Sequence, residues 1–351
     1  MSAIYRYNKQ ETIVSPLDPI EDLMTWIEGL QGVGYTAELL KSVHGFRDKR
    51  EIEISARSIS ALATNALNLL DQAYSGIALV SFLPLYYAIS NLSKIYIVTA
   101  GLRTTLARQK RHGANYDVDK KRSHSLLNEN VNIHTQGVFP LFYSVLTGQS
   151  ISCKRKISLK SFYPFISPIE HELSQFQGLQ SGLHLVFVRV NGDTASGFRL
   201  ILEAAVPHTR LAKDIRGYKS FVGLRTDQPR QKAISPTVQA SSIEEAIELL
   251  SGHIRRSLLY CRLVPSDSRP NPPVFVPYTG ANLLMAEEVP IWLAFFHLSN
   301  IVRYSPEYLF RLKDSKSWPL LLAMRKHALL RFLVLFWSHV NRQVVHLKGE
   351  W

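Results

Sequence analysis

The stretch FLPLYYAISNLSKIYIVTAGL, residues 82–102, carries apolar side chains almost all the way round a helix. A helix without a polar face has to be covered on every side, so this segment is expected to form the central helix of the core. Pro84 stands near its start, where a missing backbone N–H is tolerated. The neighbouring segments must then provide the cover.

The segments around this helix show the spacing of amphipathic helices. From Ile59 to Ile77 the apolar residues recur at three- and four-residue steps and form a single stripe. Shorter helices are predicted from Asp18 to Leu30, from Thr36 to Val43 and from Gly137 to Leu146. The N-terminal part of the chain is therefore predicted to be helical.

The middle third of the chain has the pattern of strands. Leu183–Val190 alternates, Asn191-Gly192 supplies a hairpin turn, and Phe198–Leu202 resumes the apolar pattern. Two further strands are predicted at Phe221–Leu224 and Leu258–Val264. This part is expected to form a mixed or antiparallel sheet.

Helical patterns return towards the C-terminus. Ser241–Leu250 begins with a capping serine and first-turn acids, and longer helices are predicted at Asn282–Arg311 and Trp318–Val345. The order of elements predicts an α+β fold, predominantly helical, with the N-terminal and C-terminal helical regions packed together. The predicted regions are 1–150, helical with a basic loop at 103–134; 151–280, mixed α/β; and 281–351, helical and packed on the first.

The chain of 351 residues has a formal net charge of +13, which indicates an acidic partner such as nucleic acid or an acidic protein. Basic residues gather in two segments, although a solvated loop would explain each of them as well. Clusters of lysine and arginine commonly bind the phosphates of nucleic acids. The predicted nucleic-acid-binding residues are Arg103, Arg108, Lys110, Arg111, Lys120, Lys121, Arg122, Arg210, Lys213, Arg216 and Lys219.

Motifs of the common enzyme classes are missing from the sequence. It has no phosphate loop, no dinucleotide-binding glycine motif, no HExxH and no GxSxG. No catalytic residue is assigned, and His112, His339 and Arg331 are the candidates for a phosphate-cleaving site. No cofactor and no metal site are expected.

The sequence also bears on the cellular compartment. Cys153 and Cys261 are the only cysteines, too few for a disulfide framework or a cysteine-rich zinc site. Charged residues interrupt the apolar segments, so no membrane span is expected. Residues Met1–Gln10 lack the apolar core of a signal peptide. These features predict a cytoplasmic protein.

Three stretches in a fixed order resemble the YaaC-like family of bacterial proteins, over about residues 55–346. They are PLYYAISNLSK (84–94) followed by His112-Gly113; GVFPLFYSVLTG (137–148) with SLKSFYPFISP (158–168); and LSNIVRYSPE (298–307). The resemblance implies a cytoplasmic protein with helical ends and a mixed middle, and it brings no catalytic assignment. The polar residues within these motifs are Asn91, Lys94, His112, Arg303 and Tyr304.

The leading hypothesis from these observations is a non-enzymatic protein that binds nucleic acid, DNA or RNA, or joins a protein complex. Bacterial anti-phage defence or a DNA-processing assembly is the setting that we consider. One alternative is a divergent helical nuclease that uses a histidine and an arginine. Another is a scaffold whose basic face binds an acidic protein partner.

Overall fold

The central helix predicted from the apolar stretch is α4 (Phe82–Thr99) of the computed structural model, and most of its side chains are buried. α3 (Lys49–Ser75) packs along one side of it and α11 (Glu288–Tyr304) along another. The structure describes residues 11–14, 18–116, 126–180, 183–204, 225–227, 232–254, 274–277, 283 and 286–347.

The N-terminal helices confirm the predicted pattern. α1 (Pro19–Gly29) is capped by Asp18, whose carboxylate accepts a hydrogen bond from the Glu21 N–H at 3.0 Å, and α2 (Val33–Ser42) follows it. α3 begins well before the predicted apolar stripe, because Asp48 accepts from the N–H groups of Arg50 and Glu51 and caps the helix at that point.

Replacing Asp48 by alanine is expected to lower the free energy of unfolding by about 1 kcal/mol, because two first-turn N–H groups lose their acceptor. Urea unfolding followed by circular dichroism measures the change. Asp71→Ala on the exposed surface of the same helix is the matched control and should alter the value by less than about 0.5 kcal/mol. Equal losses in the two variants would show that the cap does not stabilise α3.

The C-terminal helices are shorter than predicted. α11 ends at Tyr304 and α12 (Pro306–Lys313) begins directly after it, because the ring of Pro306 suits a first helical turn but not a helix interior. α13 (Trp318–Ala323) passes through a π-helix, η5 (Met324–Ala328), into α14 (Leu329–Asn341). The helical region predicted at 282–311 is thus divided at Pro306, and the last helix, predicted at 318–345, contains a π-helical turn and ends at Asn341.

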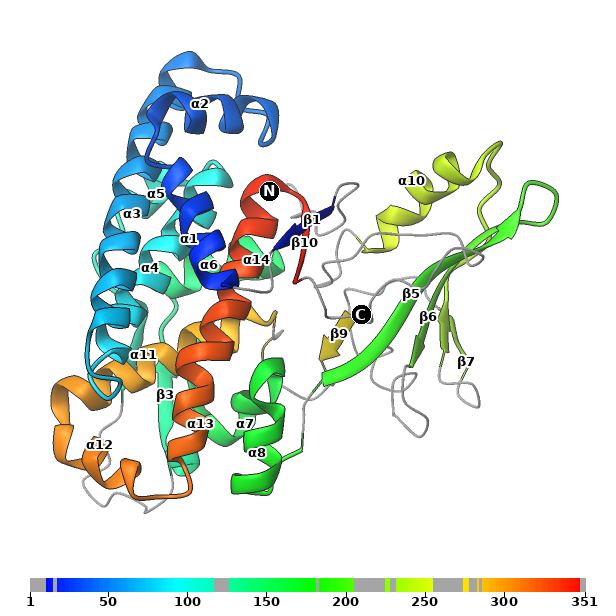
Figure 1. The fold of residues 1–351 in the computed structure, drawn as a ribbon. Coiled ribbons are helices and arrows are strands. Elements are labelled where there is room, and N and C mark those ends of the chain that lie inside the picture. Colours follow the sequence, from blue (N-terminus) through cyan, green and yellow to red (C-terminus); the bar gives the residue numbers. More distant parts are fainter. Residues whose placement is uncertain are drawn as a thin grey trace.

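The two helical regions share one core. α14 packs against α1 and α4, and the rings of Trp26 and Trp337 lie 5.7 Å apart at the first of these contacts. After α14 the chain forms β10 (Val344–Leu347), which pairs in parallel with β1 (Glu11–Val14). Figure 1 shows the N-terminal and C-terminal helices side by side. The α+β, predominantly helical fold with packed helical regions is confirmed.

A small antiparallel sheet lies against this core, in the strand order β2-β3-β4. Part of the predicted basic loop 103–134 belongs to it, because Val131 and Ile133 alternate with polar residues and face the core. The two strands β2 and β3 within this segment were not predicted from the sequence. The elements of this part are α5 (Arg103–Ala107), β2 (Ala114–Tyr116), η1 (Leu126–Asn128), β3 (Asn130–Ile133), α6 (Val138–Thr147), β4 (Arg155–Ser158), α7 (Leu159–Phe162), η2 (Tyr163–Phe165), η3 (Ser167–Ile169) and α8 (Glu170–Gln177).

The larger sheet is antiparallel, in the order β7-β8-β6-β5-β9, and lies beside the helical part (Figure 1). The predicted hairpin exists, but its turn comes later, at Asp193–Gly197, where the Asp193 carboxylate accepts from the N–H groups of Ala195 and Ser196. The strands predicted at 221–224 and 258–264 lie outside the described residues. The elements are β5 (Leu183–Asp193), β6 (Gly197–Ala204), β7 (Arg225–Asp227), β8 (Lys232–Ile234), α10 (Ile243–Ile254) and β9 (Val274–Pro277).

Among the described residues, every helix is too short or too polar to cross a membrane.

Candidate functional site

Three basic residues from distant parts of the sequence meet at α4. Lys94 of α4 donates a hydrogen bond to Asn91 at 3.1 Å, one turn before it. The hydroxyl of Tyr86 lies 2.8 Å from Nδ1 of His112. The guanidinium of Arg303, at the end of α11, lies 5.1 Å from the centre of the Tyr87 ring. We call Lys94, His112 and Arg303, with Tyr86, Tyr87 and Asn91, the α4 cationic cluster.

His112 is held in place by a close approach of two glycines. Gly113 has φ +86° and Gly137 has φ +130°, both in the left-handed region, and a Cβ on Gly137 would lie 2.4 Å from the Gly113 Cα. The N–H of Phe139, in the first turn of α6, donates to the His112 carbonyl at 2.8 Å. The sequence motifs that contain these residues therefore fold as one unit, and this unit positions the His112 ring.

The positive charges of the cluster are not neutralised by carboxylates among the described residues. Burial lowers the pKa of Lys94, and burial with the charge of Lys94 lowers the pKa of His112. Neutral His112 can accept from Tyr86 at Nδ1, and its proton then lies on Nε2, where it can be donated. Within the described ranges, no carboxylate lies within ion-pair distance of Lys94 or Arg303.

The predicted nucleic-acid-binding residues divide into three groups. Arg108, Lys110 and Arg111 are exposed and lead directly into His112, so they form a basic rim beside the cluster. Arg103 is not free in the same way, because its Nε contacts Glu51 at 3.2 Å. The remaining predicted residues, Lys120, Lys121, Arg122, Arg210, Lys213, Arg216 and Lys219, lie outside the described residues.

The other two candidates for phosphate cleavage are not brought together. Arg331 forms an ion pair with Glu287, and its Nε lies 3.0 Å from that carboxylate. The His339 ring packs at a tilt against the Tyr96 ring, with ring centres 4.1 Å apart, and its Nε2 lies 3.3 Å from the Thr99 hydroxyl. Arg331 and His339 are eight positions apart in α14, which is about 12 Å along a helix axis. Both residues therefore belong to the packing of α14.

Tyr304, the last of the polar residues in the motifs, follows Arg303 and is 63% exposed. Its ring is free to meet a ligand at the surface. Asn91 instead supports Lys94 from within the cluster. The structure thus gathers four of the five motif residues at one place and leaves the fifth at its edge.

A second polar cluster is enclosed in the core, and sequence reasoning missed it. The Glu129 carboxylate accepts from the Tyr116 hydroxyl at 2.6 Å and lies 2.8 Å from Nε2 of His297 in α11. The signal was a histidine within the apolar run of α11, since a buried polar side chain needs a partner. His297 is fully buried, so this cluster holds the fold together and is not open to a ligand.

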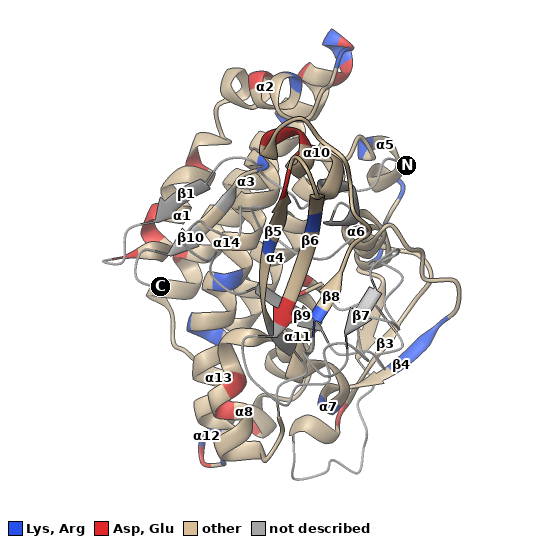
Figure 2. Cartoon of the chain, turned by 90° about the vertical axis from the view of Figure 1, so that its right-hand side faces the viewer, with Lys and Arg blue, Asp and Glu red and all other residues tan. Residues whose placement is uncertain are grey.

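The larger sheet shows a different arrangement of charge. Figure 2 faces this sheet, and both basic and acidic positions lie on its described strands. Glu203 contacts both Arg189 and Lys232 at 2.6 Å. The described basic residues on this sheet are therefore partly neutralised, unlike those at α4.

Among the described residues no group of three side chains has the arrangement of a metal site. A family model for the YaaC-like Protein matches residues 35–340, which include the whole α4 cationic cluster. Comparison with curated proteins and with solved structures gives no match.

Proposed function

The chain belongs to the YaaC-like protein family, and we propose that it binds the phosphate backbone of a nucleic acid at the α4 cationic cluster. The observation that carries the proposal is the meeting of Lys94, His112 and Arg303 without an ion-pair partner among the described residues. Such a protein would act in the bacterial cytoplasm, as part of a DNA-processing or anti-phage defence assembly.

The donors of the cluster suit a phosphate group. A half-buried lysine loses hydration, and an anion beside it offsets that loss. Arginine can bind two phosphate oxygens at once, and the Nε2 proton of neutral His112 adds a third kind of donor. A carboxylate ligand would need fewer donors than the cluster offers.

A polymer fits the surface better than an isolated phosphate. The basic rim of Arg108, Lys110 and Arg111 continues the positive surface beyond the reach of one phosphate, so neighbouring phosphates of a strand can be bound together. Tyr304 follows Arg303 in the chain and its ring is exposed, so an unpaired base can stack on it. These two features favour a single strand over a duplex.

Alanine at Lys94 or Arg303 is expected to weaken binding of a fluorescein-labelled 20-nucleotide single strand by about tenfold each, because each change removes a charge-assisted hydrogen bond. Fluorescence anisotropy at low salt measures the affinity. Lys41→Ala, an exposed lysine on α2, is the matched control and should change the affinity by less than about twofold. Equal effects of all three substitutions would place the strand elsewhere.

The same mixtures test the two alternatives. Intact oligonucleotides after long incubation are expected for a binding protein. Cleavage that disappears in His112→Ala would instead assign a nuclease to this cluster. Absence of any oligonucleotide binding at about 50 mM salt would favour a scaffold with an acidic protein partner.

A further inference from the structure

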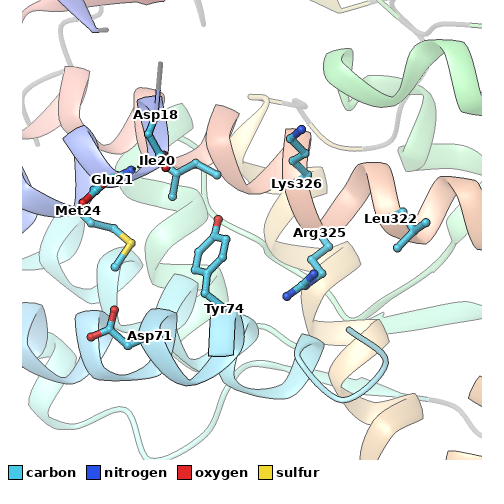
Figure 3. Close-up of a pocket in the computed structure, with 9 residues that line it drawn as sticks. All are labelled: Asp18, Ile20, Glu21, Met24, Asp71, Tyr74, Leu322, Arg325 and Lys326. Atoms are coloured by element: carbon cyan, nitrogen blue, oxygen red, sulfur yellow. Dashed lines mark hydrogen bonds between the residues drawn. The ribbon is translucent and has the colours of Figure 1, made fainter. Parts of the chain in front are cut away.

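A pocket of about 510 Å³ lies between α1, the end of α3 and the α13–η5 segment. Both acidic and basic side chains line it. Figure 3 shows Asp18, Glu21, Met24 and Asp71 on one side and Leu322, Arg325 and Lys326 on the other, with Tyr74 between them. The volume is within the range of small-ligand sites, about 300–1,000 Å³. Unlike the enclosed cluster around Glu129, this pocket is open to a ligand.

The charges on the two walls do not neutralise each other directly. None of the three carboxylates lies within ion-pair distance of Arg325 or Lys326. Asp18 is used as the cap of α1, whereas the Asp71 carboxylate is exposed and has no such role. A negative wall and a positive wall thus face each other across the pocket.

The positive wall is positioned by the π-helix. Residues Met324–Ala328 form this wider turn, and within it Arg325 donates a hydrogen bond to the Ala73 carbonyl at 3.0 Å, at the end of α3. That contact fixes the guanidinium at the pocket and leaves further N–H donors for a ligand. Single π-helical turns are found preferentially at functional sites.

The space between the walls is largely apolar. Ile20, Met24 and Leu322 line it, and the ring of Tyr74 stands in the middle. Burial raises the pKa of Tyr74 to about 12, so its hydroxyl stays protonated and can donate. A fitting ligand has an apolar body, a cation at one end and an anion at the other.

We propose that this pocket binds a short apolar peptide with free termini, its ammonium group at Asp71 and its carboxylate at Arg325 and Lys326. A single amino acid fits less well, because its two charges sit on one carbon and cannot reach opposite walls. A fatty acid would leave the acidic wall without a partner. The proposal does not depend on nucleic-acid binding, which we propose for other residues.

Titration calorimetry with trileucine tests the proposal, since trileucine has an apolar body and both free termini. Trileucine is expected to bind to one site per chain, and acetylating its N-terminus or amidating its C-terminus is expected to weaken binding by about tenfold. Asp71→Asn should weaken trileucine binding but leave N-acetyl-trileucine unaffected. Lys326→Ala should weaken trileucine binding but leave the C-terminal amide unaffected.

Two further variants complete the test. Leu322→Trp fills the pocket and should abolish binding, whereas Leu249→Trp, an exposed leucine on α10, should leave it unchanged. Absence of trileucine binding by the wild type, or equal affinity for trileucine and the doubly blocked peptide, would overturn the proposal. Asp71→Asn should bind the labelled oligonucleotide like the wild type, so failure of one proposal can be told from failure of the other.

Discussion

Replacing His297 by leucine is expected to lower the free energy of unfolding by about 3–5 kcal/mol, because it leaves the buried carboxylate of Glu129 without its imidazole hydrogen-bond partner. His297 is fully buried and Glu129 nearly so, so water cannot take the place of the imidazole. Urea unfolding followed by circular dichroism, at pH 7, measures the loss.

The double variant His297→Leu/Glu129→Leu distinguishes the effect of losing the polar pair from the effect of losing side-chain packing on the free energy of unfolding. With both polar groups removed, no buried charge is left alone, and the double variant is expected to be more stable than His297→Leu by about 2 kcal/mol. A double variant that loses the sum of the two single losses would show that the pair does not act as a unit.

The pair of Glu129 and His297 should also make the stability of the protein depend on pH. Burial acts to raise the pKa of Glu129. The hydrogen bond and charge of His297, with the hydrogen bond from the Tyr116 hydroxyl, have the larger opposite effect, so the pKa is lowered from 4.5. A lowered pKa stabilises the fold above the unfolded value, and this contribution is lost as the pH falls through the folded pKa. The difference in stability between wild type and Glu129→Gln should therefore shrink below pH 4.5.

Alanine at Gly137 is expected to lower the free energy of unfolding by about 3 kcal/mol or more. The φ of +130° is open only to glycine, and the new Cβ would lie 2.4 Å from the Gly113 Cα, so the backbone has to move. The loop that carries His112 moves with it, and we expect oligonucleotide binding to weaken as well. Thermal or urea unfolding and the anisotropy titration measure the two effects.

Gly148 provides the matched control for this substitution. It also has a positive φ, +68°, at the end of α6, but no heavy atom lies within 4 Å of a Cβ placed there. Gly148→Ala is therefore expected to cost about 1 kcal/mol, the strain of the backbone angle alone. Similar losses at the two glycines would mean that the contact between Gly113 and Gly137 is not a constraint.

The sequence was sufficient to predict the helices, because the periodicity of apolar residues reports burial directly. The predictions from sequence were wrong where the local pattern of residues favours one structure and contacts made in the folded protein favour another. The segment 103–134 is rich in basic residues and was predicted as a loop, yet Val131 and Ile133 pair with neighbouring strands and reach the core. Likewise, the hairpin turn follows the capping contacts of Asp193, not the Asn191-Gly192 pair.

The candidate site was only partly visible in the sequence. The motifs in the sequence contain Asn91, Lys94, His112 and Arg303. The sequence does not show that α4, the His112 loop and α11 bring these residues together. Tyr86 and Tyr87 were counted as core because aromatic residues in an apolar helix usually are. Their contacts to His112 and Arg303 depend on tertiary packing, which periodicity does not report.

The salt dependence of oligonucleotide binding tests the central claim most directly. Wild type and Lys94→Ala/Arg303→Ala are compared by anisotropy between about 50 and 200 mM salt, and the logarithm of the association constant is plotted against the logarithm of the salt concentration. Two lost phosphate contacts on a single strand should reduce the slope by about 1.4 in the double variant. Parallel lines for the two proteins would contradict the proposal that the α4 cationic cluster holds the phosphates.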